Sequence, residues 1–230
     1  MRMSLLAIAG SGYAHSHSHS HIASALESNI RAAADAHVRP NADQSGSPTV
    51  VSVGLSIFGL EQTQLRKDTL TANGYISFAW NDPRLAWSPA YYGNLTQIPV
   101  SASALWIPDI TLYNSADASL PLASTEQKLA LVMSNGDVMW IPKTRFSFAY
   151  NKTEVDGKHK LNATLKFGSW VYSDQDLDIQ PKDPEVLNDM YESTEFTLLN
   201  STFTRQLIFY SCCPEGYPRL DVSLTIEKKN

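Results

Sequence analysis

Two hydrophobic periods divide the chain. After a polar start, apolar side chains recur at helical spacing, at Ile22, Leu26 and Ile30. Residues that lie three or four apart share one face of an α-helix. Ser24 and Glu27 have the spacing of a capping box, and Pro40 cannot continue a helix, so the pattern predicts one amphipathic helix that ends near Val38.

From Thr49 the period changes to two, which is typical of half-buried strands. The alternating apolar positions are Val51, Val53, Leu55 and Ile57; Ile76, Phe78 and Trp80; Leu161, Ala163, Leu165 and Phe167; and Leu220, Val222, Leu224 and Ile226. Tyr75 has the opposite phase to Ile76 and is expected to point away from the core. Asn135-Gly136 separates two apolar runs and predicts a hairpin. The pattern indicates an all-β fold, an immunoglobulin-like β-sandwich of about ten strands with one N-terminal α-helix.

Composition agrees with a single folded domain. Of the 230 residues, 43% are hydrophobic and 18% are charged, which is enough apolar surface for a core. We expect residues 22–230 to form one ligand-binding domain and residues 1–21 to form a flexible N-terminus. A formal charge of −5 argues against a nucleic-acid partner, and no run of 18 apolar residues predicts a membrane span.

The N-terminus and the glycosylation sequons favour secretion. Met1–Ala14 has a basic residue, a short apolar stretch and a small-x-small ending, as a minimal signal peptide does. The alternating His-Ser segment from His15 to His21 permits two interpretations, metal capture or a flexible tail, and we favour the tail. Four Asn-x-Ser/Thr sequons predict glycosylation at Asn94, Asn151, Asn162 and Asn200. We therefore expect an extracellular glycoprotein.

The two cysteines of the chain are neighbours, Cys212 and Cys213. They exclude a disulfide framework and a four-cysteine zinc site, and we expect no metal and no cofactor. They are either two reduced thiols or a vicinal disulfide, and in a secreted chain the disulfide is favoured. Tyr210 and Tyr217 flank the pair.

This Tyr-x-Cys-Cys-x-x-x-Tyr segment resembles the ligand-closing loop of nicotinic acetylcholine receptor α-type subunits and of the soluble acetylcholine-binding proteins. Trp106-Ile107-Pro108-Asp109, the following Leu112–Asp117, and Lys166–Tyr172 resemble further loops of the same family, in the same order. In that family each site lies between two subunits. The resemblance implies a principal face made by Tyr113, Trp170, Tyr210, Cys212, Cys213 and Tyr217, with Asp109 as an anchor of the Trp170 loop.

The resemblance also implies a complementary face, made by Tyr75, Leu131, Met139 and Ile141. Tyr75 stands where the family usually has Trp. A strict two-residue turn at Asn135-Gly136 would put Leu131 on the opposite face from Met139, and only a bulged turn would place them together. Electron-rich rings around a quaternary ammonium attract it by about 0.5–2 kcal/mol per good contact. The expected ligands are acetylcholine and nicotine-like amines.

The chain departs from the family at one disulfide. Ala149 and Ala163 stand at the two cysteine positions, although the intervening loop still has thirteen residues. This loop is polar, and no membrane helices follow it, so we expect a secreted, free-standing homopentameric binding protein. The alternative is the extracellular domain of a ligand-gated channel subunit. An enzyme has little support, because His37 and His159 belong to no catalytic pattern. An adhesion module is a further alternative.

Overall fold

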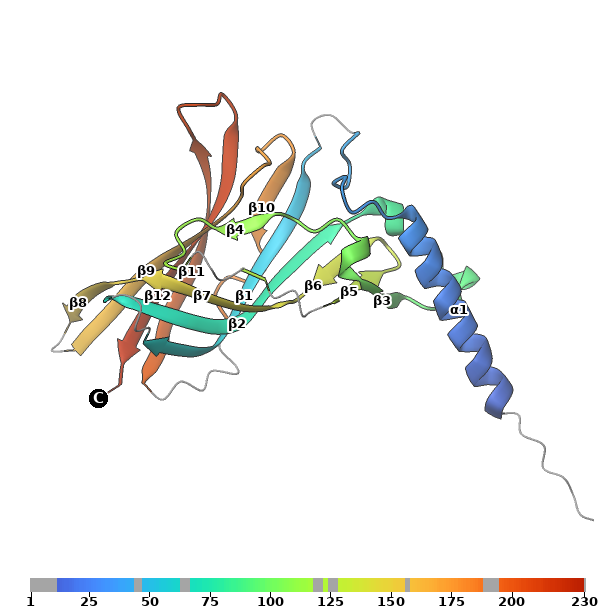
Figure 1. Cartoon of the computed structure of the whole chain (residues 1–230), viewed down its shortest axis with the longest axis horizontal. Helices are drawn as coiled ribbons and strands as arrows, with labels where there is room; N and C mark the ends of the chain where they lie inside the picture. Colours follow the sequence, from blue (N-terminus) through green and yellow to red (C-terminus); the bar gives the residue numbers. More distant parts are fainter. Residues whose placement is uncertain are drawn as a thin grey trace, which may run out of the picture.

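The computed structural model describes residues 12–43, 47–62, 67–117, 122–123, 128–155, 158–187 and 195–229. Residues 1–11, which carry most of the predicted signal-like segment, lie outside the described residues. So does Asp189, one of six acidic residues between 174 and 192 whose approach to the site from a neighbouring subunit the sequence leaves open. The described part contains one α-helix and two β-sheets (Figure 1). No described helix has the length and apolar character needed to cross a membrane.

Helix α1 spans Gly12–Ala33, so it begins earlier and ends earlier than the sequence predicted. Ser24 lies inside the helix and does not cap it. The apolar stripe is as expected, since Leu26 and Ile30 are buried, and the helix packs beside β3 and a short 3-10 helix, Pro83–Leu85. After the helix, the Asp35 carboxylate accepts the His37 N–H at 2.8 Å, a local bond that replaces helical pairing.

Twelve described strands form the sandwich, seven in one sheet and five in the other. The first sheet has the order β10 (Leu177–Pro181), β1 (Thr49–Gln62), β2 (Thr69–Asn81), β6 (Asp137–Trp140), β5 (Leu129–Met133) and β3 (Gln97–Ser101), with β7 (Lys143–Ala149) also beside β2. The second has the order β11 (Phe196–Phe209), β12 (Gly216–Lys228), β9 (Lys158–Ser169) and β4 (Ile110–Leu112), with β8 (Asn151–Val155) beside β9. Two further 3-10 helices span Pro89–Tyr91 and Ala102–Ala104.

The core lies between the sheets and is built from the alternating positions. Every apolar residue of the four predicted alternating runs is buried, with Val51, Ile76, Leu165 and Val222 completely enclosed. Tyr75 is only half-buried and alternates with buried Ile76, so it points to the outer face as predicted. The all-β sandwich with one N-terminal helix is therefore confirmed.

The turn between β5 and β6 has three residues, not two. Leu131 pairs with Met139 and Val132 pairs with Val138, which leaves 134–136 as the loop. The Gly136 N–H donates to the Met133 carbonyl at 2.9 Å, and Gly136 has φ +88, the arrangement of a type I turn with a glycine bulge. The strict two-residue turn is wrong, and Leu131 lies on the same face as Met139.

Candidate functional site

Asp109 organises the segment that carries Trp170. One carboxylate oxygen accepts from the Ser169 hydroxyl at 2.7 Å, and the other accepts the N–H groups of Trp170 and Val171 at 3.1 and 3.0 Å. The Ser169 hydroxyl in turn accepts the Tyr172 N–H at 2.8 Å. The predicted anchor is therefore present, with Asp109 half-buried, and it holds a tight turn. This turn presents the Trp170 ring to solvent at 78% exposure.

Tyr113 is hydrogen-bonded to strand β9, the strand that leads to Trp170. Its N–H donates to the Lys166 carbonyl at 2.9 Å, and its hydroxyl donates to the Ser169 carbonyl. The side-chain amide of Asn114 pairs with β9 as a neighbouring strand would. It donates to the Thr164 carbonyl at 2.7 Å and accepts the Lys166 N–H at 2.9 Å. The Tyr113 and Trp170 rings meet edge to face with centroids 6.2 Å apart.

Gly168 makes room for Tyr113, and sequence reasoning missed it. A Cβ atom at this position would lie 2.6 Å from the Tyr113 hydroxyl oxygen and 2.7 Å from the ring carbon that bears it. A glycine inside a strand pattern often marks such a close approach, and this signal was available in the sequence. Burial raises the pKa of the Tyr113 hydroxyl to about 12, with the neighbouring Tyr210 and Asp109 acting in the same direction.

The hairpin of β11 and β12 carries the remaining predicted principal residues. Tyr217 lies on β12 and Tyr210 directly follows β11, with ring centroids 5.6 Å apart, near edge to face. Cys212 and Cys213 form a disulfide at the tip, so the alternative of two reduced thiols is wrong. The Cys213 N–H donates to the Tyr210 carbonyl at 3.2 Å. The hairpin therefore presents two tyrosines below a rigid sulfur-bearing tip.

These principal residues belong to one aromatic group. Tyr113 contacts Trp170 and Tyr210 contacts Tyr217, and the hydroxyls of Tyr210 and Tyr217 lie near enough to Tyr113 to contribute to its raised pKa. Tyr210 is 43% exposed and Trp170 is 78% exposed, so ring surfaces remain open to a ligand. Electron-rich ring faces attract cations, and among side chains Trp does so most strongly.

The predicted complementary residues lie on the outer face of the other sheet. Tyr75 alternates with buried Ile76, and Met139 and Leu131 are paired across β6 and β5. Ile141 follows β6 and is 37% exposed. The Tyr75 ring packs against Phe58 with centroids 5.7 Å apart. This half is an apolar, strand-built surface with one aromatic ring.

The two predicted halves come from different sheets and different faces. The principal residues surround β9 and the β11–β12 hairpin of the five-stranded sheet, whereas Tyr75, Leu131 and Met139 face outward from the seven-stranded sheet. The core separates these surfaces, because each sheet turns its buried face toward the other. One chain therefore does not bring the two predicted halves together.

Two of the six acidic side chains between 174 and 192 are paired within the chain. Asp176 forms an ion pair with Arg39 at 2.7 Å, and Asp178 forms one with Arg205 at 2.6 Å. Asp183 differs, since its carboxylate reaches the outer face of β1, where a Cβ on Gly54 would lie 3.0 Å from it.

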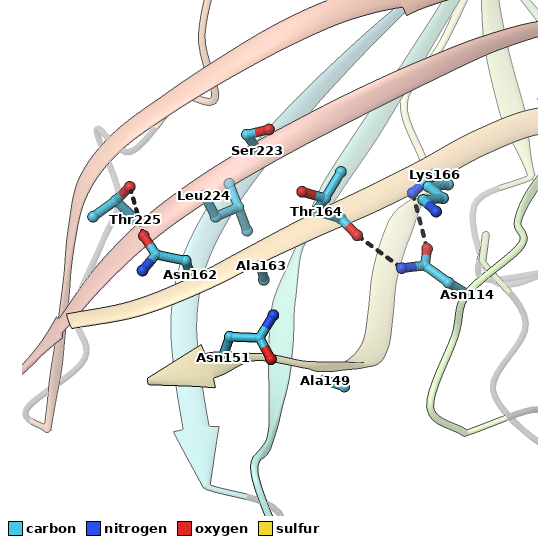
Figure 2. Close-up of a pocket in the computed structure, with 10 residues that line it drawn as sticks. All are labelled: Asn114, Ala149, Asn151, Asn162, Ala163, Thr164, Lys166, Ser223, Leu224 and Thr225. Carbon is cyan, nitrogen blue, oxygen red and sulfur yellow. Dashed lines mark hydrogen bonds between the residues drawn. The ribbon is translucent and has the colours of Figure 1, made fainter. Parts of the chain in front are cut away.

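A pocket of about 410 Å³ opens where the family's second disulfide would stand. Ala149 and Ala163 both line it, together with Asn114, Asn151, Asn162, Thr164, Lys166, Ser223, Leu224 and Thr225 (Figure 2). The Asn114 amide closes one side through its bonds to strand β9, and the Thr225 hydroxyl donates to Asn162 at 3.3 Å on the other. Two alanines thus leave space, lined by amides and hydroxyls.

The four sequon asparagines differ in accessibility. Asn94 is exposed in a turn with φ +62, and Asn151 and Asn200 are exposed on strands β8 and β11. Asn162 is half-buried, and its amide donates to the Thr153 hydroxyl at 2.9 Å. Asn151 and Asn162 are direct cross-strand partners. Glycosylation at each of them remains a prediction.

Comparison with known proteins identifies related sequences. The model of the neurotransmitter-gated ion-channel ligand binding domain matches residues 23–230. A human neuronal acetylcholine receptor subunit alpha-2 is 34% identical over 184 residues, which cover 78% of this chain and 34% of the receptor subunit. An alpha-type acetylcholine receptor subunit of Caenorhabditis elegans is 31% identical over 194 residues, covering 83% of this chain and 38% of that subunit. The chain thus spans about a third of the length of these relatives.

Proposed function

Because the chain belongs to the family of neurotransmitter-gated ion-channel ligand-binding domains, we propose that it binds acetylcholine and nicotine-like amines where two copies of the chain meet. The family is one of receptor binding domains and not of enzymes. The observation that carries the proposal is the aromatic group of Tyr113, Trp170, Tyr210 and Tyr217 beneath the disulfide hairpin.

The chemistry of this group suits a quaternary or protonated amine. A quaternary ammonium has no N–H group that would need a carboxylate, and each well-placed ring face attracts either kind of cation by about 0.5–2 kcal/mol. Cys212 and Cys213 close the cage from above. Tyr75, Leu131, Met139 and Ile141 of the neighbouring copy supply the opposite wall, where the flexible Met139 side chain suits ligands of varied shape.

A closed homopentamer is the proposed assembly. Each copy carries one principal and one complementary surface, and a contact between two different surfaces repeats around a ring until the ring closes. The number five comes from the family resemblance. Light scattering should therefore give a mass near five chains, and a monomer would exclude a site shared between copies.

We propose that the protein acts as a secreted binding protein that captures neurotransmitter outside the cell. The described start of the loop between Ala149 and Ala163 is polar and exposed at 151–154, which favours contact with water over contact with a membrane domain. The second candidate is the extracellular domain of a channel subunit, which the receptor relatives favour. Sequencing the complete transcript distinguishes them, since a channel requires four apolar segments downstream.

Titration calorimetry with acetylcholine tests the ligand. We expect binding to the wild-type protein and a loss of affinity of about 100-fold or more in Trp170→Ala. Tyr91→Ala is the matched control, because Tyr91 is 84% exposed and lies outside the aromatic group. Unchanged affinity in Trp170→Ala would exclude the proposed cage.

A further inference from the structure

The β11–β12 hairpin extends beyond the strand that supports it. β12 pairs with β9 from Arg219 to Glu227, whereas β11 and β12 pair with each other as far as Phe209 and Gly216. Between Arg219 and its tip, the hairpin is therefore a ribbon of two strands only. Figure 1 shows this ribbon projecting from the body of the protein. Isolated two-stranded ribbons are only marginally stable. The direction in which this one points must be set by contacts at its base.

Arg205 makes a contact of this kind. It is the cross-strand partner of Leu220, which is fully buried, so Arg205 lies on the side of the hairpin that faces the other sheet. Its Nε donates to the Asp178 carboxylate at 2.7 Å, and a second guanidinium nitrogen lies 2.6 Å from the same oxygen. Charge-assisted hydrogen bonds of this length are among the stronger polar contacts in proteins.

The position of the Asp178 side chain, the partner of Arg205, is fixed by its strand and by a hydrogen bond. It lies on β10, where it pairs with Val50 of β1 in the seven-stranded sheet. The Gln180 amide donates to its other carboxylate oxygen at 2.5 Å, and the Asp178 side chain is only 17% exposed. The ion pair therefore joins the base of the hairpin to the opposite sheet of the sandwich.

The segment between Trp170 and β10 makes a second contact with the hairpin. The Asp174 N–H donates to the Gly216 carbonyl at 2.8 Å. Another described ion pair, Arg219 with Asp221 at 2.7 Å, stays within the five-stranded sheet. Among these described ion pairs, Asp178 with Arg205 is thus the one that crosses between sheets.

We propose that the Asp178–Arg205 ion pair is a positioning contact that fixes the angle of the β11–β12 hairpin, and with it the distance of Tyr210 and Tyr217 from Trp170. Without the ion pair, the hairpin samples more orientations. The orientation that closes on a ligand is then a smaller fraction of the population. Apparent affinity falls in proportion to that fraction. The effect on ligands rests on the proposed function, whereas the effect on hairpin motion does not.

Hydrogen exchange of the ligand-free protein tests the positioning role directly. In Asp178→Asn, which keeps the side-chain shape, and in Arg205→Gln, which removes the guanidinium group, we expect the amides of 207–218 to exchange about three- to tenfold faster. Arg145→Gln is the matched control. It breaks a 2.8 Å ion pair with Glu61 that lies within the seven-stranded sheet, away from the hairpin. Its hairpin amides should exchange as in the wild type.

Dissociation of acetylcholine, followed by stopped-flow tryptophan fluorescence, tests the consequence for binding. We expect dissociation to be about three- to tenfold faster in Asp178→Asn and Arg205→Gln, unchanged in Arg145→Gln, and partly restored in the charge-exchanged protein Asp178→Arg/Arg205→Asp. The restoration separates an ion-pair role from a general loss of stability.

Hairpin exchange that is the same in all variants would overturn the proposal. Protection lost evenly over both sheets would also overturn it, since that is the signature of a structural role alone. Faster hairpin exchange with unchanged dissociation would contradict the link to the ligand. If the wild-type protein binds no acetylcholine, the proposed function fails, and the exchange measurement still decides whether the ion pair positions the hairpin.

Discussion

The two halves of the proposed site are built by different means. On the principal half, Trp170 and the tyrosines sit on turns and a hairpin whose shape depends on a few polar atoms, chiefly the Asp109 carboxylate. On the complementary half, Leu131 and Met139 are fixed by strand register alone. A single side chain can therefore disable the principal half, whereas the complementary half should tolerate most changes that leave its sheet intact.

After Trp170→Ala itself, the largest expected effect is again on the principal half, from Asp109→Ala. It removes the acceptor of three hydrogen bonds, so the Trp170 turn loses its shape. Because hydrogen bonds to charged groups are worth about 1.5–3 kcal/mol each, we expect acetylcholine affinity to fall roughly 30- to 100-fold in calorimetry.

Asp137→Ala is the matched control for this change. Asp137 also accepts side-chain hydrogen bonds, from Asn81 of β2 at 2.8 Å and from Asn135 of the β5–β6 turn at 2.7 Å. The acetylcholine affinity of the Asp137→Ala variant should remain close to that of the wild type. Equal losses in the two variants would mean that Asp109 matters only for general stability.

A smaller loss is expected from Gly168→Ala. The added methyl group would lie 2.6 Å from the Tyr113 hydroxyl oxygen and displace that ring from the cage. We expect affinity to fall about tenfold. Gly59→Ala, where a Cβ meets nothing within 4 Å, should leave binding unchanged. A wild-type affinity in Gly168→Ala would show that the position of Tyr113 is unimportant.

The complementary half should respond weakly. Met139→Ala removes part of an apolar wall without changing the register that holds Leu131 and Ala79 beside it. We expect a loss of about two- to fivefold, measured in the same titration. A loss as large as that of Asp109→Ala would reverse the contrast between the halves.

The smallest effect concerns pH. Burial raises the pKa of the Tyr113 hydroxyl to about 12 from an ordinary 10.0, so the folded protein retains a proton that the unfolded chain loses. Stability therefore falls between about pH 10 and 12 through this group, by an amount that partial exposure reduces. Tyr113→Phe should lack this part of the decline. When tyrosine ionisation is followed by phenolate absorbance, the Tyr113→Phe variant should lack one tyrosine that ionises near pH 12. If the variant instead lacks a tyrosine that ionises near pH 10, the assignment is contradicted.

The sandwich could be predicted because its strands leave local signals, whereas the proposed site residues were predicted from the resemblance of short motifs to a known family. Alternation marked the buried face of each strand, and it placed Tyr75 outside. The helix start was wrong because a serine with a glutamate three residues later is also common inside helices, where Ser24 lies. The place of Leu131 depended on the φ angle of Gly136, which sequence alone leaves open.

Long-range pairing explains what sequence reasoning missed. Arg205 and Asp178 are 27 residues apart and on different sheets, so no spacing rule connects them. The pocket at Ala149 and Ala163 likewise depends on how β7, β8 and β9 lie together. Gly168 is different, since a glycine between Phe167 and Ser169 in a strand pattern could have suggested close packing.

Mixed assemblies test the central claim most directly, that each site combines a principal half from one copy with a complementary half from the next. Trp170→Ala disables the first half, and Met139→Lys places a repelling cation on the second. Each variant alone should bind acetylcholine weakly. Oligomers reassembled from both should regain a fraction of intact sites with wild-type affinity in calorimetry. No recovery in verified mixed oligomers would contradict a site shared between copies.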